Sequence, residues 1–231
     1  MKFHYTCMPI GDAALLISFG DQISEEINQQ VICFCNTFEK LLPIDGIIEL
    51  IPSYNSVTII YNPMYVSYDS ALDYLPTECL DENTSSSSNT IEIPVCYDYR
   101  FGMDLQEVAS LNRLSVEEVI QIHTSGTYKV YMLGFMPGFM YLGGLNEKIT
   151  CPRKQQPRQK VYQGSVGIAG NQTGIYPMES PAGWQIIGRT PIAIFSPFSN
   201  PHTLAKQGDL IKFKSITVEE FEEIQTATMI K

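Results

Sequence analysis

Residues 133–145 read LGFMPGFMYLGGL, residues 164–177 read GSVGIAGNQTGIYP, and residues 180–189 read SPAGWQIIGR. Glycine, proline and aromatic residues alternate densely in all three segments. Glycine costs backbone entropy in a regular element, and proline removes a hydrogen-bond donor. A long helix or a central strand would not tolerate this composition. The segments therefore predict short strands joined by tight turns, a pattern typical of a β-sandwich or a β-barrel.

A polar segment separates this region from the start of the chain. Residues 81–90 read DENTSSSSNT and cannot contribute to a core, so we predict a linker there. Residues 1–80 show an apolar run at 13–19, helical spacing of apolar residues at 24–41, and two strand patterns within 47–61. We expect a small α+β domain whose helix covers its own sheet. The apolar stripe of that helix would alternatively face a partner.

Residues 91–231 form the second predicted domain, which is mainly β. Asp104 with Glu107, and Ser115 with Glu118, have the spacing of a helix cap and its reciprocal acid. We expect a strand at 91–95, two helices beginning at these caps, short strands up to residue 213 and a final helix at 219–224.

Composition excludes several classes of protein. The chain has 231 residues, 44% hydrophobic residues and a net charge of −10, which argues against nucleic-acid binding. No segment resembles a signal peptide or spans a bilayer, so we expect no membrane association and a cytoplasmic location. The six cysteines show no metal-ligand spacing with the three histidines. We therefore expect reduced, mostly buried cysteines and no metal site.

A basic segment is the first candidate for chemistry. Residues 148–160 contain five of the chain's 15 lysines and arginines and no acidic residue. Arg153 and Arg158 each follow a proline that restricts how the backbone places them. The segment suits a carboxylate or phosphate ligand or an acidic partner, and a solvated basic loop is the alternative.

Other candidates are polar residues near apolar surfaces. His123 lies on the inner face of the helix that begins near Ser115, where a hydrogen-bonded core role competes with a catalytic one. Gln172 and Tyr176 offer neutral hydrogen-bonding groups in a glycine-rich segment without a phosphate-loop motif. Trp184 is the only tryptophan. It is either a core residue, with Arg189 at the surface, or it lines a ligand site together with Arg189.

The motifs together resemble one family closely. LGFMPGFMYLGGL, CPRKQQPR at 151–158, GSVGIAGNQTGIYP and SPAGWQIIGRTP at 180–191 are similar to the signature of the family of KipI and the 5-oxoprolinase B subunit, also described as allophanate hydrolase subunit 1. The resemblance extends over essentially the whole chain. It implies a small N-terminal α+β domain followed by a cyclophilin-like β-barrel domain.

The resemblance implies two functions. In the first, the chain is one subunit of ATP-dependent 5-oxoprolinase, which converts 5-oxo-L-proline to L-glutamate. Its partners are then a homologous C subunit, of the allophanate hydrolase subunit 2 type, and an A subunit. ATP with Mg²⁺ is a co-substrate and no tightly bound cofactor is expected. Arg153, Arg158 and Arg189, with Gln172 and Tyr176, would bind substrate or phosphate, and His123 would transfer protons.

In the second function, the chain is a KipI-like inhibitor of a sporulation histidine kinase. The residues expected to form its partner interface are Phe135, Pro137, Phe139, Tyr141 and Trp184. The same surface would bind the C subunit in the oxoprolinase. We favour the oxoprolinase, because the arginine set suits small anions.

Overall fold

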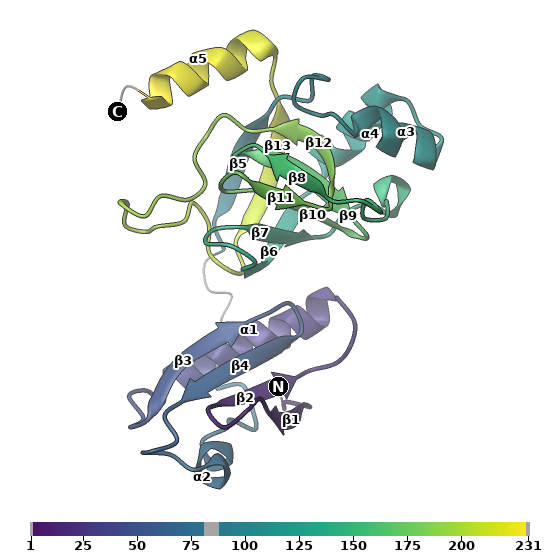
Figure 1. The fold of residues 1–231 in the computed structure, drawn as a ribbon. Coiled ribbons are helices and arrows are strands. Elements are labelled where there is room, and N and C mark those ends of the chain that lie inside the picture. Colours follow the sequence, from purple (N-terminus) through teal and green to yellow (C-terminus); the bar gives the residue numbers. More distant parts are fainter. Residues whose placement is uncertain (1, 81–87, 230–231) are drawn as a thin grey trace. The chain divides into compact units, whose positions relative to one another are not determined.

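The computed structural model describes residues 2–80 and 88–229 and divides into two compact units, Met1–Ser87 and Ser88–Lys231 (Figure 1). Each unit is described by itself. Residues 81–87 of the predicted linker lie outside the described residues. No helix in the described ranges is long and apolar enough to cross a membrane.

The N-terminal unit is an antiparallel sheet with a long helix packed on it. The strands lie in the order β1-β2-β4-β3. The bounds are β1 (Thr6–Pro9), β2 (Ala14–Ser18), α1 (Glu25–Glu39), β3 (Ile47–Pro52), β4 (Ser56–Tyr61) and α2 (Tyr68–Asp73). Helix α1 begins where the Ser24 hydroxyl accepts a hydrogen bond from the Ile27 amide, as its sequence predicts.

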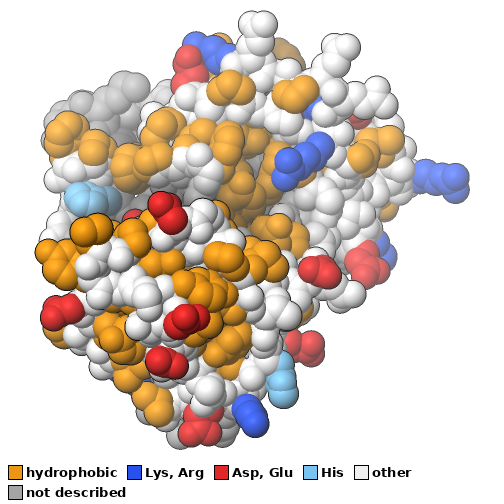
Figure 2. Space-filling model, turned by 60° about the horizontal axis from the view of Figure 1, so that its bottom comes forward, with side chains coloured by type: hydrophobic (Ala, Val, Ile, Leu, Met, Phe, Trp, Pro, Cys, Tyr) orange, Lys and Arg blue, Asp and Glu red, His pale blue; other side chains and the backbone are white. Residues whose placement is uncertain are grey.

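Helix α1 buries its apolar stripe on the sheet of its own unit. Phe34 is fully buried and contacts the rings of Phe3, Tyr5 and Phe19 with centroids 5.5–5.7 Å apart. The prediction that this helix covers its own sheet is therefore confirmed. Exposed apolar side chains remain in this unit, including Ile48 and Met64, and Figure 2 shows hydrophobic patches among acidic side chains on the viewed face.

One cysteine expectation is wrong. Cys33 of α1 and Cys79 are joined by a disulfide, although we expected reduced cysteines. Their separation of 46 residues gave no spacing signal in the sequence. Cys7, Cys35, Cys96 and Cys151 are free.

The C-terminal unit is a nearly closed barrel of seven strands in the order β12-β9-β10-β7-β6-β13-β5. The bounds are β5 (Thr90–Val95), β6 (Tyr128–Leu133), β7 (Met140–Gly143), β9 (Ser165–Ala169), β10 (Gln172–Ile175), β12 (Gln185–Arg189) and β13 (Leu210–Ser215). Backbone hydrogen bonds of 2.9 and 3.0 Å join Cys96, just after β5, to Arg189 at the end of β12. This bridge links the two edge strands of the sheet, and the predicted α+β fold with a barrel is confirmed.

Further elements surround the barrel. They are α3 (Leu105–Asn112), α4 (Val116–Ser125), the short helix Glu147–Ile149, the two-stranded sheet of β8 (Arg158–Val161) and β11 (Ser180–Ala182), and α5 (Val218–Met229) (Figure 1). The capping box of Ser115 and Glu118 is present at the start of α4. Asp104 occupies the N-cap position of α3, but its side chain makes no capping hydrogen bond. The carboxylate is engaged by other residues, described below.

Candidate functional site

An aromatic pocket with a volume of about 220 Å³ opens on the barrel unit. Its lining residues come from the β6–β7 turn, strand β7, the segment before β8, the end of β10 and the segment from β11 to Trp184. They are Phe135, Phe139, Tyr141, Arg153, Pro157, Tyr176, Pro181, Ala182, Gly183 and Trp184. Six of these ten were predicted as binding or interface residues. Residues that are 49 positions apart in sequence, Phe135 and Trp184, thus share one cavity.

Phe139 is the centre of the aromatic pocket. Its ring is 1% exposed and makes edge contacts with four other rings, at centroid distances of 4.7–5.7 Å. The partners are Phe135, Tyr141, Tyr176 and Trp184. Such edge-to-face pairs each add to the stability gained from burial. The walls of the pocket are therefore held in place by one another.

Backbone geometry shapes the pocket. Phe135 has a φ of +69° and is 66% exposed, which is an unusual conformation for a bulky residue. Such strained residues cluster at binding sites. Gly174 of β10 provides space for the rings, because a Cβ atom there would lie 3.0 Å from Trp184 and 3.1 Å from Phe139. It would also lie 2.7 Å from the Met140 carbonyl oxygen, so a side chain at this position is excluded.

The aromatic pocket contains one cation without a counter-charge. Arg153 is exposed, and no described acidic side chain forms an ion pair with it. Burial raises the pKa of Tyr176, Tyr141 adds to that rise, and Arg153 lowers it. The Tyr176 hydroxyl is thus protonated at neutral pH and able to donate a hydrogen bond. The pocket offers flat apolar walls, a hydroxyl and a guanidinium, a set that suits a small ring bearing a carboxylate.

A buried ionic cluster, here called the Asp104 clamp, holds the segment that carries Arg153. Asp104 is 2% exposed and accepts two hydrogen bonds from the Arg158 guanidinium, at 2.5 and 2.7 Å. It also accepts bonds from the Lys154 ammonium, at 3.0 Å, and from the Ile186 amide, at 2.7 Å. The Arg158 fork is therefore occupied by Asp104 rather than presented to a ligand. The predicted anion-binding role of Arg158 finds no support in these contacts.

His123 lies in the barrel core. It is fully buried, with Nδ1 2.7 Å from the Tyr97 hydroxyl and Nε2 3.0 Å from the Thr173 hydroxyl. Thr173 donates its own hydrogen to the Gly167 carbonyl, so it accepts from Nε2–H. Nδ1 then accepts from Tyr97. Burial lowers the pKa of His123 to about 3, and these contacts support a structural role rather than the predicted proton transfer.

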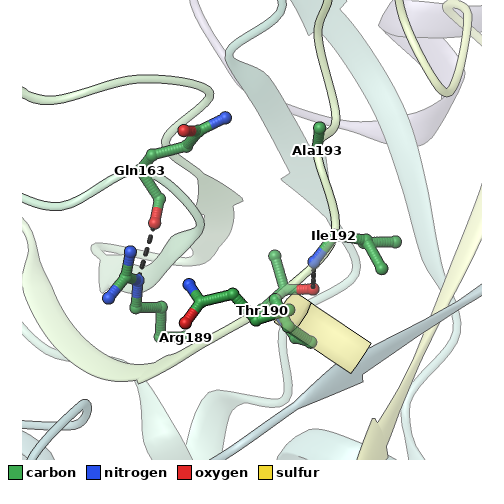
Figure 3. A pocket seen from close by; sticks show the side chains of 7 residues that line it. Gln163, Arg189, Thr190, Ile192 and Ala193 are labelled. Atoms are coloured by element: carbon green, nitrogen blue, oxygen red, sulfur yellow. Dashed lines mark hydrogen bonds between the residues drawn. The ribbon is translucent and has the colours of Figure 1, made fainter. Parts of the chain in front are cut away.

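The remaining predicted residues lie outside the aromatic pocket. Pro137 is exposed in the β6–β7 turn, and Gln172 is 6% exposed, with no partner for its amide nitrogen among the described residues. Arg189 lines a second cavity, here called the arginine pocket (Figure 3). The other lining residues are Gln163, Thr190, Pro191, Ile192, Ala193 and Gln225. The predicted arginine set is thus divided among three places.

Comparisons with known proteins agree with this architecture. The family model of the carboxyltransferase domain, subdomain C and D, matches residues 5–205, which places the chain in that class of domain. The 5-oxoprolinase B subunit of Bacillus subtilis (strain 168) is 44% identical over 96% of this chain and 97% of its own length. The chain belongs to the family of the 5-oxoprolinase B subunit.

Solved structures extend the comparison. A conserved uncharacterised protein from Pyrococcus horikoshii is 49% identical over 94% of this chain and 100% of its own, with a TM-score of 0.57. The urea amidolyase of K. lactis is 22% identical over 97% of this chain and 15% of its own, with a TM-score of 0.80. That second likeness shows the shared fold alone.

The Asp104 clamp predicts a large loss of stability when its acid is removed. Asp104→Asn leaves the charge of Arg158 without its buried partner, whereas Lys154 keeps Glu107 at 3.0 Å. Removing one member of a buried ion pair typically costs about 3 kcal/mol or more. Urea unfolding measures the change. The matched control is Glu179→Gln, which breaks the exposed pair of Lys160 and Glu179 and should cost less than about 1 kcal/mol. Equal losses of unfolding free energy in the two variants would contradict the role of Asp104 as a buried ionic partner.

The buried histidine predicts acid sensitivity. The pKa of His123 is about 3 in the fold against an ordinary 6.5, so the unfolded chain binds its proton more readily. The contribution of His123 to stability is complete above about pH 6.5 and declines as the pH falls toward 3, by up to about 1.4 kcal/mol per pH unit. Urea unfolding across this range should show a shallower decline for His123→Gln than for the wild type. Parallel curves would contradict the assignment.

Proposed function

We propose that this chain is the B subunit of an ATP-dependent 5-oxoprolinase that converts 5-oxo-L-proline to L-glutamate. The observation that carries the proposal is the 44% identity to a 5-oxoprolinase B subunit over nearly the full length of both chains. A second relative of the same name, from Escherichia coli O157:H7, is 36% identical over 90% of this chain. The names of these relatives favour the oxoprolinase over the kinase-inhibitor alternative.

The aromatic pocket is the part of this chain that we assign to the reaction. The substrate is a small five-membered lactam bearing one carboxylate. Arg153 would pair with that carboxylate, and the rings of Phe139 and Trp184 would contact the flat lactam. The Tyr176 hydroxyl would donate a hydrogen bond to a substrate oxygen.

The reaction requires activation that this pocket does not supply by itself. An amide carbon is a poor electrophile, and phosphoryl transfer from ATP to the lactam oxygen would make it more reactive toward water. Mg²⁺ would accompany the ATP phosphates. We assign the ATP chemistry to the complex with the A and C subunits, in which this chain binds and orients the substrate for attack by water. The chain alone is expected to be inactive.

Reconstitution tests this function. The chain is combined with its A and C subunits, and glutamate release from 5-oxoproline and ATP is followed with and without it. Activity should require all three proteins. Arg153→Gln should lower kcat/KM by about tenfold to a hundredfold, because a charge-assisted hydrogen bond is worth roughly 1.5–3 kcal/mol.

Lys160→Gln is the matched control. It removes a positive charge from the same basic segment, but Lys160 pairs with Glu179 at the surface and does not line the aromatic pocket. Its activity should equal that of the wild type. An intact complex of all three proteins without activity would reject the function, whereas full activity of Arg153→Gln would reject only the role of the pocket.

A further inference from the structure

The arginine pocket is a second cavity on the barrel, separate from the aromatic pocket. Its volume is about 150 Å³, and none of its lining residues lines the aromatic pocket. Arg189 is the last residue of β12, where its backbone forms the bridge to Cys96 that joins the edge strands of the barrel. The side chain therefore starts from one of the most constrained backbone positions of the unit.

The guanidinium of Arg189 is fixed in orientation. Its Nε–H donates to the Gln163 carbonyl oxygen at 2.7 Å, as the dashed line in Figure 3 shows. The rings of Tyr162 and Phe221 lie against it, at 5.3 and 5.7 Å from their centroids. These contacts engage one edge and the faces of the group. Its two terminal nitrogens have no acceptor among the described residues, so a planar pair of donors is left for a ligand.

Arg189 has no acidic partner among the residues that the structure describes. Among described residues, Arg100, Lys154, Arg158, Lys160 and Lys214 all form ion pairs with acidic side chains. Arg189 forms no ion pair with a described acidic side chain, although the chain carries a net charge of −10. Burial lowers the pKa of Arg189, and the Coulomb influence on it comes from Tyr162 rather than from a carboxylate. A half-buried cation without a counter-charge is costly unless an anion binds it.

Neutral polar residues line the rest of this pocket. Gln163 and Gln225 line the pocket, and each carries a side-chain amide with two N–H groups. The Thr190 hydroxyl accepts a hydrogen bond from the Ile192 amide at 3.4 Å (Figure 3), so its own hydrogen is available to a ligand. The pocket thus combines one positive charge with several neutral donors. One positive charge with neutral donors suits a ligand group that carries one negative charge on two oxygens in a plane.

We propose that the arginine pocket binds the carboxylate of a small molecule, at a site distinct from the proposed oxoprolinase pocket. The Arg189 fork pairs with both carboxylate oxygens. Gln225, which lines the same pocket, supplies a neutral amide donor beside them. Phosphate shares the oxyanion chemistry but carries about −1.5 to −2 charges near neutral pH, so beside one half-buried cation its excess negative charge loses water without a partner. Carboxylate binding is therefore stronger than phosphate binding here.

Titration of the ¹⁵N-labelled full chain with acetate at constant ionic strength tests the proposal. The Nε–H resonance of Arg189, held by the Gln163 carbonyl, should shift with a saturable dependence on acetate. Arg189→Gln should weaken acetate binding, followed at the Gln225 side-chain amide, by about tenfold or more. Gln225→Ala keeps the arginine and should weaken binding, followed at Arg189, by a few-fold. Inorganic phosphate, titrated in parallel, should bind more weakly than acetate.

Lys148→Gln is the control for loss of one positive charge elsewhere, because Lys148 is exposed and does not line the arginine pocket, and it should leave the Arg189 titration unchanged. The absence of a saturable shift at Arg189 in the wild type would overturn the site. Unchanged acetate affinity in a folded Arg189→Gln would do the same, and Gln225→Ala decides the matter if that variant does not fold. Tighter binding of phosphate than of acetate would overturn the assignment to a carboxylate.

Discussion

The carboxylate of Asp104 is the point on which the site depends. Two cations, from Lys154 and Arg158, and the backbone amide of Ile186 converge on one group that is 2% exposed. Through this group the start of α3, the basic segment and strand β12 are joined. A buried acid of this kind adds little net stability compared with an apolar core, but it fixes one arrangement because each charge requires its partner. The segment that carries Arg153 and Pro157 is anchored in this way.

The shape of the aromatic pocket depends on the anchored basic segment and on the glycine at position 174. Gly174 leaves the space into which Phe139 and Trp184 pack, since a Cβ atom would lie about 3 Å from both. The left-handed backbone at Phe135 and Gly138 turns the chain sharply between β6 and β7. A cluster of mutually packed rings is rigid, so a ligand entering the pocket meets preformed walls and binding requires little reordering.

Local features of the sequence predicted local structure well. Strands β3 and β4 are the two strands expected within residues 47–61, and Ser24 and Ser115 cap the helices that their spacing predicted. Here the signal and the structure both involve residues a few positions apart. The weak strand β1 was missed, because its four residues are mostly exposed and lack an apolar alternation.

Contacts between residues far apart in the sequence could not be predicted from local patterns. Asp104 and Arg158 are 54 positions apart, so Asp104 was interpreted as a helix cap and Arg158 as an anion ligand. The same limitation hid the disulfide between Cys33 and Cys79 and the partners of His123. Most of the aromatic pocket was nevertheless predicted, because its residues lie in motifs dense in glycine and proline. Their grouping in one cavity, with Arg153 but without Arg189, required the fold.

Trp184 allows the most direct test of the account, because it is the only tryptophan of the chain and lines the aromatic pocket. Labelling this chain with 5-fluorotryptophan and assembling it with unlabelled A and C subunits gives one ¹⁹F resonance from the pocket wall. Addition of 5-oxo-L-proline should shift that resonance with a saturable dependence on substrate concentration. An unchanged resonance in a complex that converts the substrate would show that the aromatic pocket is not where the lactam binds.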